Sequence, residues 1–333
     1  MQSLGVRVPK SDAEATRRRL QELGVLRIDL EVGKEGDDVV FPVSASCGPK
    51  LPTAPFDFKA RLVRPAGYQD LLAWPKDLLD LAPRAFDQIG DIVIVKVPPR
   101  VAMRAAELGS AIRKFAKARA VFADGGVKEE FRVRDLERIS GVGESLTHIR
   151  ENGVNLWVDP AKAYFSPRLA TERERVAGLV VPGEHLVDLF GGVAPLGVQA
   201  ALKGARVDSV DLNPAAIDLA RRNVADNKVE DKVKLHLADA KLIGKRLLPA
   251  DRIVMNLPHG AKAFLDVAAH LAKPGATIHY HEILTPAAVA ARGDAVVAEL
   301  LRNGKRVSLA GTRVVRNYSP TEAHVVFDFK VAA

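Results

Sequence analysis

The sequence has few of the residues that build covalent or metal cross-links. Cys47 is the only cysteine among 333 residues, so a disulfide within the chain and a cluster of thiolate metal ligands are both excluded. No apolar run approaches the roughly 20 residues that a membrane-spanning helix needs, and the N-terminus has no apolar signal core. We therefore expect a cytoplasmic protein with no membrane span and no bound metal.

Charge, in contrast, is plentiful and unbalanced. Lys and Arg number 49 against 41 Asp and Glu, which gives a net charge of +8 and an isoelectric point near 9.5. The hydrophobic content of 47% is that of a soluble globular protein. A basic balance fits a polyanionic partner such as RNA, although a merely soluble basic protein would show it too.

The length predicts two or three domains, because 333 residues exceed one ordinary core. Residues 1–46 form a small unit, which either senses the substrate or only stabilises the chain. Residues 47–59 are rich in turn formers and predict a linker. Residues 60–158 predict a basic α+β domain for RNA, with twelve Lys or Arg and seven Asp or Glu between positions 96 and 150. Residues 159–333 form the last domain.

The last domain alternates strands with helices. Strands are expected at 186–190, 207–212, 233–237, 253–256 and 276–283, and two more at 305–315 and 323–330. Such alternation predicts a doubly wound, mainly parallel α/β sheet. Only residues 316–322 separate the last two strands, too few for a crossover helix, so these strands should pair antiparallel.

Acidic residues follow the first three of these strands. Asp188 ends the first strand, where it would repel a pyrophosphate, and the next turn lacks the glycine spacing of a dinucleotide site. Asp211 and Asp239 follow the second and third strands. This set suits a ligand with an amino group, a ribose diol and an adenine edge but no phosphate, namely S-adenosylmethionine. Each carboxylate alone could instead cap a helix or lie on the surface.

The fourth strand ends on Asn256, Leu257 and Pro258, beside the expected position of the transferred methyl group. The Asn256 amide offers a donor and an acceptor to a flat heterocycle, and Pro258 fixes the turn. DNA adenine methyltransferases carry Asn-Pro-Pro and an aromatic residue here. Leu257 and His259 occupy the diagnostic positions, which argues against that group.

Two further stretches hold candidate functional charges. Ser166 and Pro167 predict a helix start, and Glu172 would then lie about one and a half turns into the helix, where a charged face is usually only solvated. Arg132 and Arg134 alternate on one face of an expected strand. Two guanidiniums there could grip phosphates or polarise a carbonyl oxygen, or form a solvated face.

Together these motifs resemble those of the archaeal and eukaryotic tRNA (guanine 37, N1) methyltransferase family. They occur in order and at fitting spacings: FRVR at 131–134, TH at 147–148, ENG at 151–153, YFSPR at 164–168, ER at 172–173, DLFGGV at 188–193, DLNP at 211–214 and NLP at 256–258. The match is specific from about residue 85 onward and looser over the first domain of archaeal members. One departure is Ala194, where the family more often has glycine.

The resemblance implies a class I S-adenosylmethionine-dependent methyltransferase. Its Rossmann-like, seven-stranded sheet with an antiparallel last strand would follow two smaller α+β RNA-binding domains. Glu172 would be the general base for guanine N1, Arg132 would stabilise O6 with Arg134 in reserve, and Asn256 would hold the base. The implied RNA-binding residues are Arg132, Arg134, His148, Asn152 and Arg168. The implied cofactor-binding residues are Phe165, Arg173, Asp188, Phe190, Gly191, Gly192, Val193, Asp211, Leu212, Asn213, Asp239, Ala240, Asn256, Leu257 and Pro258.

The expected partner is a tRNA with guanosine at position 37, bound by a monomer whose first domain checks the tRNA shape. Two other functions stay open. Related archaeal enzymes transfer the aminocarboxypropyl group of the same cofactor during wyosine synthesis, and some also methylate a later intermediate. A chain of this fold could also bind RNA without catalysis, although all three strand-end carboxylates are present.

Overall fold

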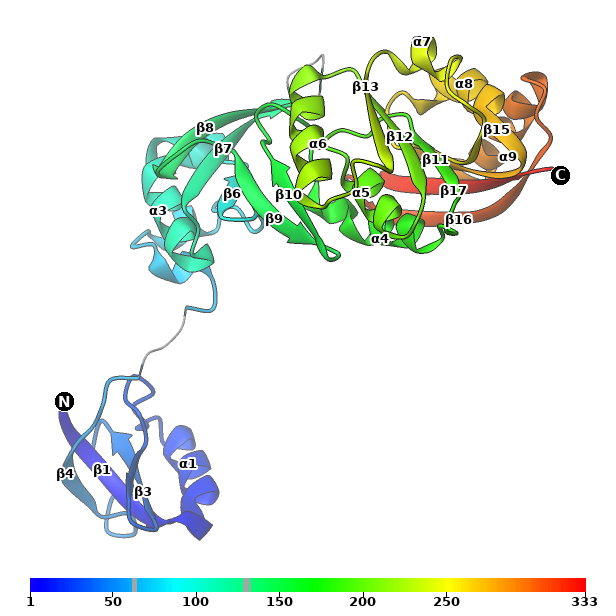
Figure 1. The fold of residues 1–333 in the computed structure, drawn as a ribbon. Helices are drawn as coiled ribbons and strands as arrows, with labels where there is room; N and C mark the ends of the chain where they lie inside the picture. The colour runs from blue at the N-terminus through cyan, green and yellow to red at the C-terminus, as the bar shows by residue number, and fades with distance from the viewer. Residues whose placement is uncertain (62–64, 128–130, 132) are drawn as a thin grey trace. The chain divides into compact units, whose positions relative to one another are not determined.

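The computed structural model describes residues 1–61, 65–127, 131 and 133–333 (Figure 1). The chain divides into two compact units, Met1–Asp70 and Leu71–Ala333. Within the described ranges, no helix is long and apolar enough to cross a membrane.

The first unit is a four-stranded antiparallel sheet with one helix packed on it. The strand order is β2-β3-β1-β4, and the core gathers Val6, Leu20, Phe41 and Val43. Its elements are β1 (Gln2–Pro9), α1 (Ala13–Glu22), β2 (Gly33–Glu35), β3 (Asp38–Val43) and β4 (Thr53–Asp57).

Strand β4 corrects the predicted linker over residues 47–59. It pairs with β1 along its whole length, so Thr53–Asp57 belong to the sheet. The proline content suggested a linker, but proline is tolerated on an edge strand, where one backbone side has no ladder partner. Pro55 lies on such an edge, since β4 is the last strand of the sheet.

The second unit begins with a small mixed sheet of order β5-β6-β7-β8. Helix α3 packs on β7 and β8. The elements are α2 (Lys76–Leu79), β5 (Asp87–Ile89), β6 (Ile92–Val95), α3 (Ala105–Ala116), β7 (Ala120–Val127) and β8 (Arg134–Gly141).

The largest sheet has seven strands in the order β13-β12-β11-β14-β15-β17-β16. The first five of these are parallel, and β17 runs antiparallel to both neighbours. The predicted fold class is therefore confirmed. Its strands are β11 (His185–Asp188), β12 (Arg206–Asp211), β13 (Val233–Leu237), β14 (Ala250–Met255), β15 (Ala272–Leu284), β16 (Val307–Asn317) and β17 (Ala323–Val331).

Helices cover both faces of this sheet and form two apolar cores. One core includes residues of α4 (Ala170–Gly178), α5 (Pro195–Leu202) and α6 (Pro214–Asp226). The other includes residues of α7 (Ala240–Gly244), α8 (Leu265–Leu271) and α9 (Val289–Arg302). The strands are thus buried on both sides, as their nearly continuous apolar sequences require.

A separate hairpin of β9 (Thr147–Glu151) and β10 (Val154–Val158) joins this layer. It packs on α5 and α6, and Leu156 shares a core with Leu186 of β11. The boundary predicted after residue 158 therefore cuts off a hairpin that packs with the last domain. Sequence periodicity identifies the strands but not the surface that covers them.

Candidate active site

A pocket of about 310 Å³ opens at the carboxyl ends of the central strands. Open α/β sheets bind ligands at this edge, because the strands end there and the loops diverge. All fifteen residues predicted to bind the cofactor line the pocket. They are Phe165, Arg173, Asp188, Phe190, Gly191, Gly192, Val193, Asp211, Leu212, Asn213, Asp239, Ala240, Asn256, Leu257 and Pro258.

The turn after β11 is shaped by small residues. A Cβ atom on Gly191 would lie 2.0 Å from the hydroxyl oxygen of the buried Ser209, so only glycine fits there. Gly192 and Ala194 both have positive φ, at 56° and 59°. Ala194 is the residue that departs from the family pattern, and it adopts the left-handed conformation that glycine takes at less cost.

Each of the three strand-end carboxylates accepts a hydrogen bond from the backbone. Asp211 accepts hydrogen bonds from the backbone N–H groups of Gly192 at 2.8 Å and Asn213 at 2.9 Å. Asp239 caps α7 by accepting from Lys241 N–H at 2.7 Å through one oxygen. Helix capping and ligand binding are compatible here, because each carboxylate oxygen has a second lone pair.

Burial raises the pKa of two carboxylates at this end of the pocket. It raises the pKa of Asp188 to about 7, with the negative charge of Asp211 acting in the same direction. Burial also raises the pKa of Asp211, although backbone N–H groups oppose the shift. A ligand that carries a cation would favour the ionised carboxylates, so this group of residues fits the sulfonium and ammonium of S-adenosylmethionine.

Arg173 forms part of the wall beside the cofactor turn. Its guanidinium is buried in an ion pair with Glu151 of β9 and lies 4.9 Å from the ring centroid of Phe165. The ion pair ties α4 to the β9–β10 hairpin. The pocket wall therefore depends on the hairpin as well as on the main sheet.

Asn256 follows β14 with its amide unoccupied. No residue of the described ranges forms a hydrogen bond with that side chain, although Asn256 lines the pocket and is half-buried. The next residues are fixed by the backbone: Leu257 C=O accepts from Gly260 N–H at 2.8 Å, and Pro258 C=O accepts from Ile283 N–H at 3.2 Å. The loop is held while the amide remains available to a ligand.

Glu172, the predicted general base, is buried but does not line the pocket. Its two carboxylate oxygens accept from Arg175 at 2.9 and 2.7 Å. Arg175 also donates to Asp328 of β17 at 2.7 Å. Burial opposes the charge of Arg175, but these two carboxylates outweigh it and raise the pKa of the guanidinium. Glu172 is thus held by a cation next to the pocket.

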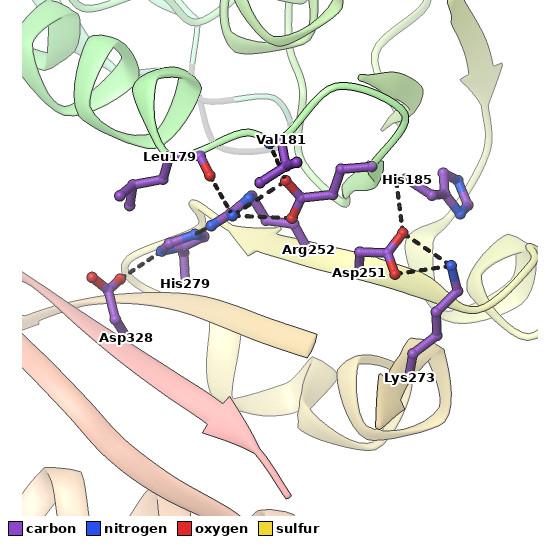
Figure 2. A network of polar contacts seen from close by, with 9 residues as sticks. Leu179, Val181, His185, Asp251, Arg252, Lys273, His279 and Asp328 are labelled. Atoms are coloured by element: carbon purple, nitrogen blue, oxygen red, sulfur yellow. Dashed lines mark hydrogen bonds and ion pairs between the residues drawn. The ribbon is translucent and has the colours of Figure 1, made fainter. Parts of the chain in front are cut away.

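The same polar network continues across the sheet (Figure 2). His279 bonds to Asp328 through Nδ1, while its Nε2 lies 2.8 Å from a guanidinium nitrogen of Arg252. Since arginine only donates, Nε2 accepts and the proton is on Nδ1. Arg252 also donates to Leu179 C=O at 2.9 Å. The second half of helix α4 is therefore tied to the sheet, through Arg175 and through the residue that follows Gly178.

The predicted RNA-binding residues have mixed surroundings. Arg132 lies outside the described residues. Arg134 is mostly buried between Asp87 and Asp124 at 2.9 and 3.3 Å and does not line the pocket. Its reserve role at the guanine oxygen stays a prediction, and it requires that the guanidinium leave these two carboxylates.

The other three residues also have structural contacts. Asn152 has a φ of 49° and donates to Ala170 C=O at 2.9 Å, so it fixes the β9–β10 turn against α4. Arg168 pairs with Asp87 at 2.7 Å but leaves half of its side chain exposed. His148 is exposed beside Trp157, with the ring centroids 5.0 Å apart. His148 and Arg168 are thus the accessible members.

Several pocket residues were not predicted from the sequence. They include Phe264, Arg316, Tyr318 and His324, with His259 noted there only as a departure from another family. Arg316 and Tyr318 lie where the chain passes from β16 towards β17, a segment without a recognisable motif. Only the pairing of the last strands brings them to the pocket.

The sheet order, the antiparallel β17 and the acidic strand ends define a class I S-adenosylmethionine-dependent methyltransferase fold. A family model described as the TRM5/TYW2 methyltransferase domain matches residues 147–307. Models of the tRNA methyltransferase 5 N-terminal domain and the TYW2 N-terminal domain match residues 5–50 and 68–144. The chain belongs to the TRM5/TYW2 methyltransferase family.

Individual relatives match nearly the whole chain. The chain is 37% identical over 344 residues to the tRNA (guanine(37)-N(1))-methyltransferase Trm5b of Pyrococcus abyssi, which covers 99% of both chains. The solved complex of aTrm5 and tRNALeu matches with 30% identity and a TM-score of 0.81, over 98% of this chain and 99% of that one. Methanocaldococcus jannaschii Trm5 in complex with adenosine matches with 28% identity and a TM-score of 0.67, over 99% of each.

Proposed function

We propose that this chain transfers the methyl group of S-adenosylmethionine to N1 of guanosine 37 in tRNA. The observation that carries the proposal is one pocket whose two ends are lined by different polar groups. One end has carboxylates after β11, β12 and β13, and the other has the unoccupied amide of Asn256. Similarity to Trm5b of Pyrococcus abyssi over the whole chain supports the choice of substrate.

The pocket residues fit the cofactor by their chemistry. Asp211 would accept from the ribose hydroxyls and Asp239 from the adenine amino group, while the small residues at 191–192 admit the methionine part. When bound, the cofactor supplies a methyl group on a positively charged sulfur. Burial raises the pKa of Asp188 to about 7, and a cation bound nearby would stabilise the ionised carboxylate.

Guanine N1 carries a proton and is a poor nucleophile until that proton leaves. We assign its removal to Glu172, and the stabilisation of the negative charge on O6 to Arg132. Glu172 must first exchange Arg175 for the guanine, because both of its oxygens accept from that guanidinium. Asn256 would hold the base through its donor and its acceptor.

The target base must leave the anticodon stack to enter such a pocket. We propose that the basic residues of 60–158 hold the RNA backbone and that residues 1–46 check the tRNA shape. The enzyme would act as a monomer in the cytoplasm. Binding should weaken as salt rises, since phosphate contacts release counterions.

A second candidate is aminocarboxypropyl transfer from the same cofactor. The match of the TYW2 N-terminal domain to residues 68–144 favours it. Both reactions use the same pocket and the same nucleotide, so the group transferred distinguishes them.

The proposal is tested with two tRNA transcripts that differ only in having guanosine or adenosine at position 37. We expect single-turnover methylation of the first and none of the second, with 1-methylguanosine as the product nucleoside. Methylation of both transcripts, or absence of S-adenosylmethionine binding in calorimetry, would contradict the proposed function.

A further inference from the structure

The pocket extends along the sheet to strands that the cofactor does not need. The acidic residues follow β13, β12 and β11 at one edge, while Arg316 and His324 come from β16 and β17 at the other. Tyr318 and His259 line this second end, and their rings meet edge to face with centroids 5.4 Å apart. This end adjoins Pro258, whose carbonyl oxygen accepts from Ile283 N–H, and so lies on the side assigned to the target base.

A β-bulge aims Arg316 into the pocket. Val314 pairs with Val325, and Arg316 pairs with His324, the neighbour of Val325 in β17. Val315 is therefore an extra residue in β16. Without it, side-chain alternation would place residue 316 on the other face from its present one. Bulges of this kind often redirect a side chain beside an active site. The pocket face of β16 thereby receives an arginine.

Arg316 has an unusual surrounding for a cation. Its Nε atom is buried and, within the described ranges, has no hydrogen-bond partner. Its guanidinium lies 5.5 Å from the ring centroid of Tyr318. The three carboxylates that line the pocket lie at the carboxyl ends of β11, β12 and β13, and β11 is four strands from β16. The opposite residue, His324, is neutral, because burial and the charges of Arg316 and His259 lower its pKa to about 4.

We propose that Arg316 binds the O6 and N7 edge of the target guanine and thereby selects guanine over adenine. The proposal rests on the proposed function and concerns the base that the same pocket receives. N1 must face the methyl group. O6 has two lone pairs, so it can accept from Arg132 through one of them while the other lone pair and N7 face a second group. Arginine donates in parallel to these two acceptors, whereas adenine presents an amino group in place of O6.

Two other anions could meet the same guanidinium: the phosphate 3′ of nucleotide 37 and the carboxylate of the cofactor. The guanine edge, the phosphate and the cofactor carboxylate can be told apart, because the effect of replacing Arg316 would depend on a different chemical group in each case. A guanine contact is lost when N7 is replaced by C–H, as in 7-deazaguanosine. A phosphate contact is lost when a methylphosphonate replaces that phosphate. Loss of a contact with the cofactor carboxylate would instead lower the affinity for S-adenosylmethionine.

The test measures kcat/KM for the wild type and Arg316→Gln on tRNA with guanosine or 7-deazaguanosine at position 37. We expect the wild type to lose about tenfold on 7-deazaguanosine. Arg316→Gln should lose roughly 10- to 100-fold on guanosine and show little further loss on 7-deazaguanosine. Arg313→Gln is the matched control, since Arg313 is an exposed cation of the same strand that does not line the pocket. It should respond to 7-deazaguanosine as the wild type does.

Three results would overturn the assignment. The first is equal loss on 7-deazaguanosine in the wild type and in Arg316→Gln. The second is that the effect of Arg316→Gln depends on the methylphosphonate and not on 7-deazaguanosine. The third is a tenfold loss of S-adenosylmethionine affinity in Arg316→Gln. Equilibrium binding of the same tRNAs in the presence of S-adenosylhomocysteine measures the coupling between Arg316 and N7 of the guanine without turnover. A wild type that binds with this coupling but methylates nothing would refute the proposed function alone.

Discussion

Glu172 presents its carboxylate to Arg175 rather than to the pocket; Glu172 is buried, and Arg175 is mostly buried. A buried carboxylate without a partner is costly, so the ion pair stabilises the empty site. Guanine, when it enters, offers Glu172 an N–H donor in exchange. The ion pair thus suits a general base that contacts its substrate only during the reaction.

We predict that Glu172→Gln keeps cofactor and tRNA affinity but lowers the single-turnover rate by about 10²- to 10⁴-fold, the usual contribution of a general base. The matched control is Glu174→Gln, because Glu174 is an exposed residue of the same helix. Rapid-quench methylation measures both variants. An unchanged rate in Glu172→Gln would remove Glu172 as the base.

Gly191 is the second residue whose environment makes a direct prediction. Gly191→Ala would force a Cβ to within 2.0 Å of the Ser209 hydroxyl oxygen, so the cofactor turn must move. We expect at least a tenfold loss of S-adenosylmethionine affinity in calorimetry. Gly191→Ala with Ser209→Ala removes the closest clash and should recover part of the affinity. Wild-type affinity in the single variant would contradict this packing argument.

At the scale of elements, β15 and β17 carry a buried pair of histidines. His281 Nδ1 and His324 Nε2 lie 3.1 Å apart. Burial lowers the pKa of His281 well below its ordinary value and that of His324 to about 4. The folded protein therefore holds both rings neutral where the unfolded chain would protonate them.

This pair makes stability depend on pH. Between about pH 6.5 and 4 the unfolded state binds more protons at His324, so the free energy of unfolding falls as pH falls, by up to about 1.4 kcal/mol per pH unit. The free energy of unfolding of His324→Gln should fall less steeply as pH falls. That of His270→Gln, which replaces an exposed histidine, should follow the wild type. Urea unfolding at several pH values measures this. Parallel curves for the wild type and His324→Gln would refute it.

The sequence predicted those elements whose signals are local. Apolar strands, glycine turns and acidic strand ends lie within a few residues of one another, so the sheet and the cofactor side of the pocket could be derived. Arg316 could not, because a bulge and the pairing of β16 with β17 bring it to the pocket. Asp328 of β17, the second partner of Arg175, was hidden for the same reason: Arg175 and Asp328 are 153 positions apart.

At the scale of the whole molecule, the chain combines a catalytic unit with a small independent one. Met1–Asp70 has its own sheet and core, and the net charge of +8 fits a polyanionic partner. We propose that the first unit contributes to the recognition of the tRNA body, while the second performs the chemistry at the anticodon loop.

Deletion of residues 1–70 tests this division of labour. We expect unchanged cofactor affinity and unchanged kcat/KM on an isolated anticodon stem-loop, because the pocket residues all belong to the second unit. On full-length tRNA, kcat/KM should fall to the stem-loop value. Full activity on intact tRNA after the deletion would show that the first unit has no part in recognition.

The central claim is that a methyl group, and no other part of the cofactor, is transferred to guanosine 37. The most direct measurement incubates the enzyme and a tRNA with guanosine 37 with S-adenosylmethionine labelled either in the methyl group or in the carboxyl carbon. The account predicts that the methyl label enters the tRNA as 1-methylguanosine and that the carboxyl label stays in solution. Entry of the carboxyl label into the tRNA would show aminocarboxypropyl transfer and contradict the account.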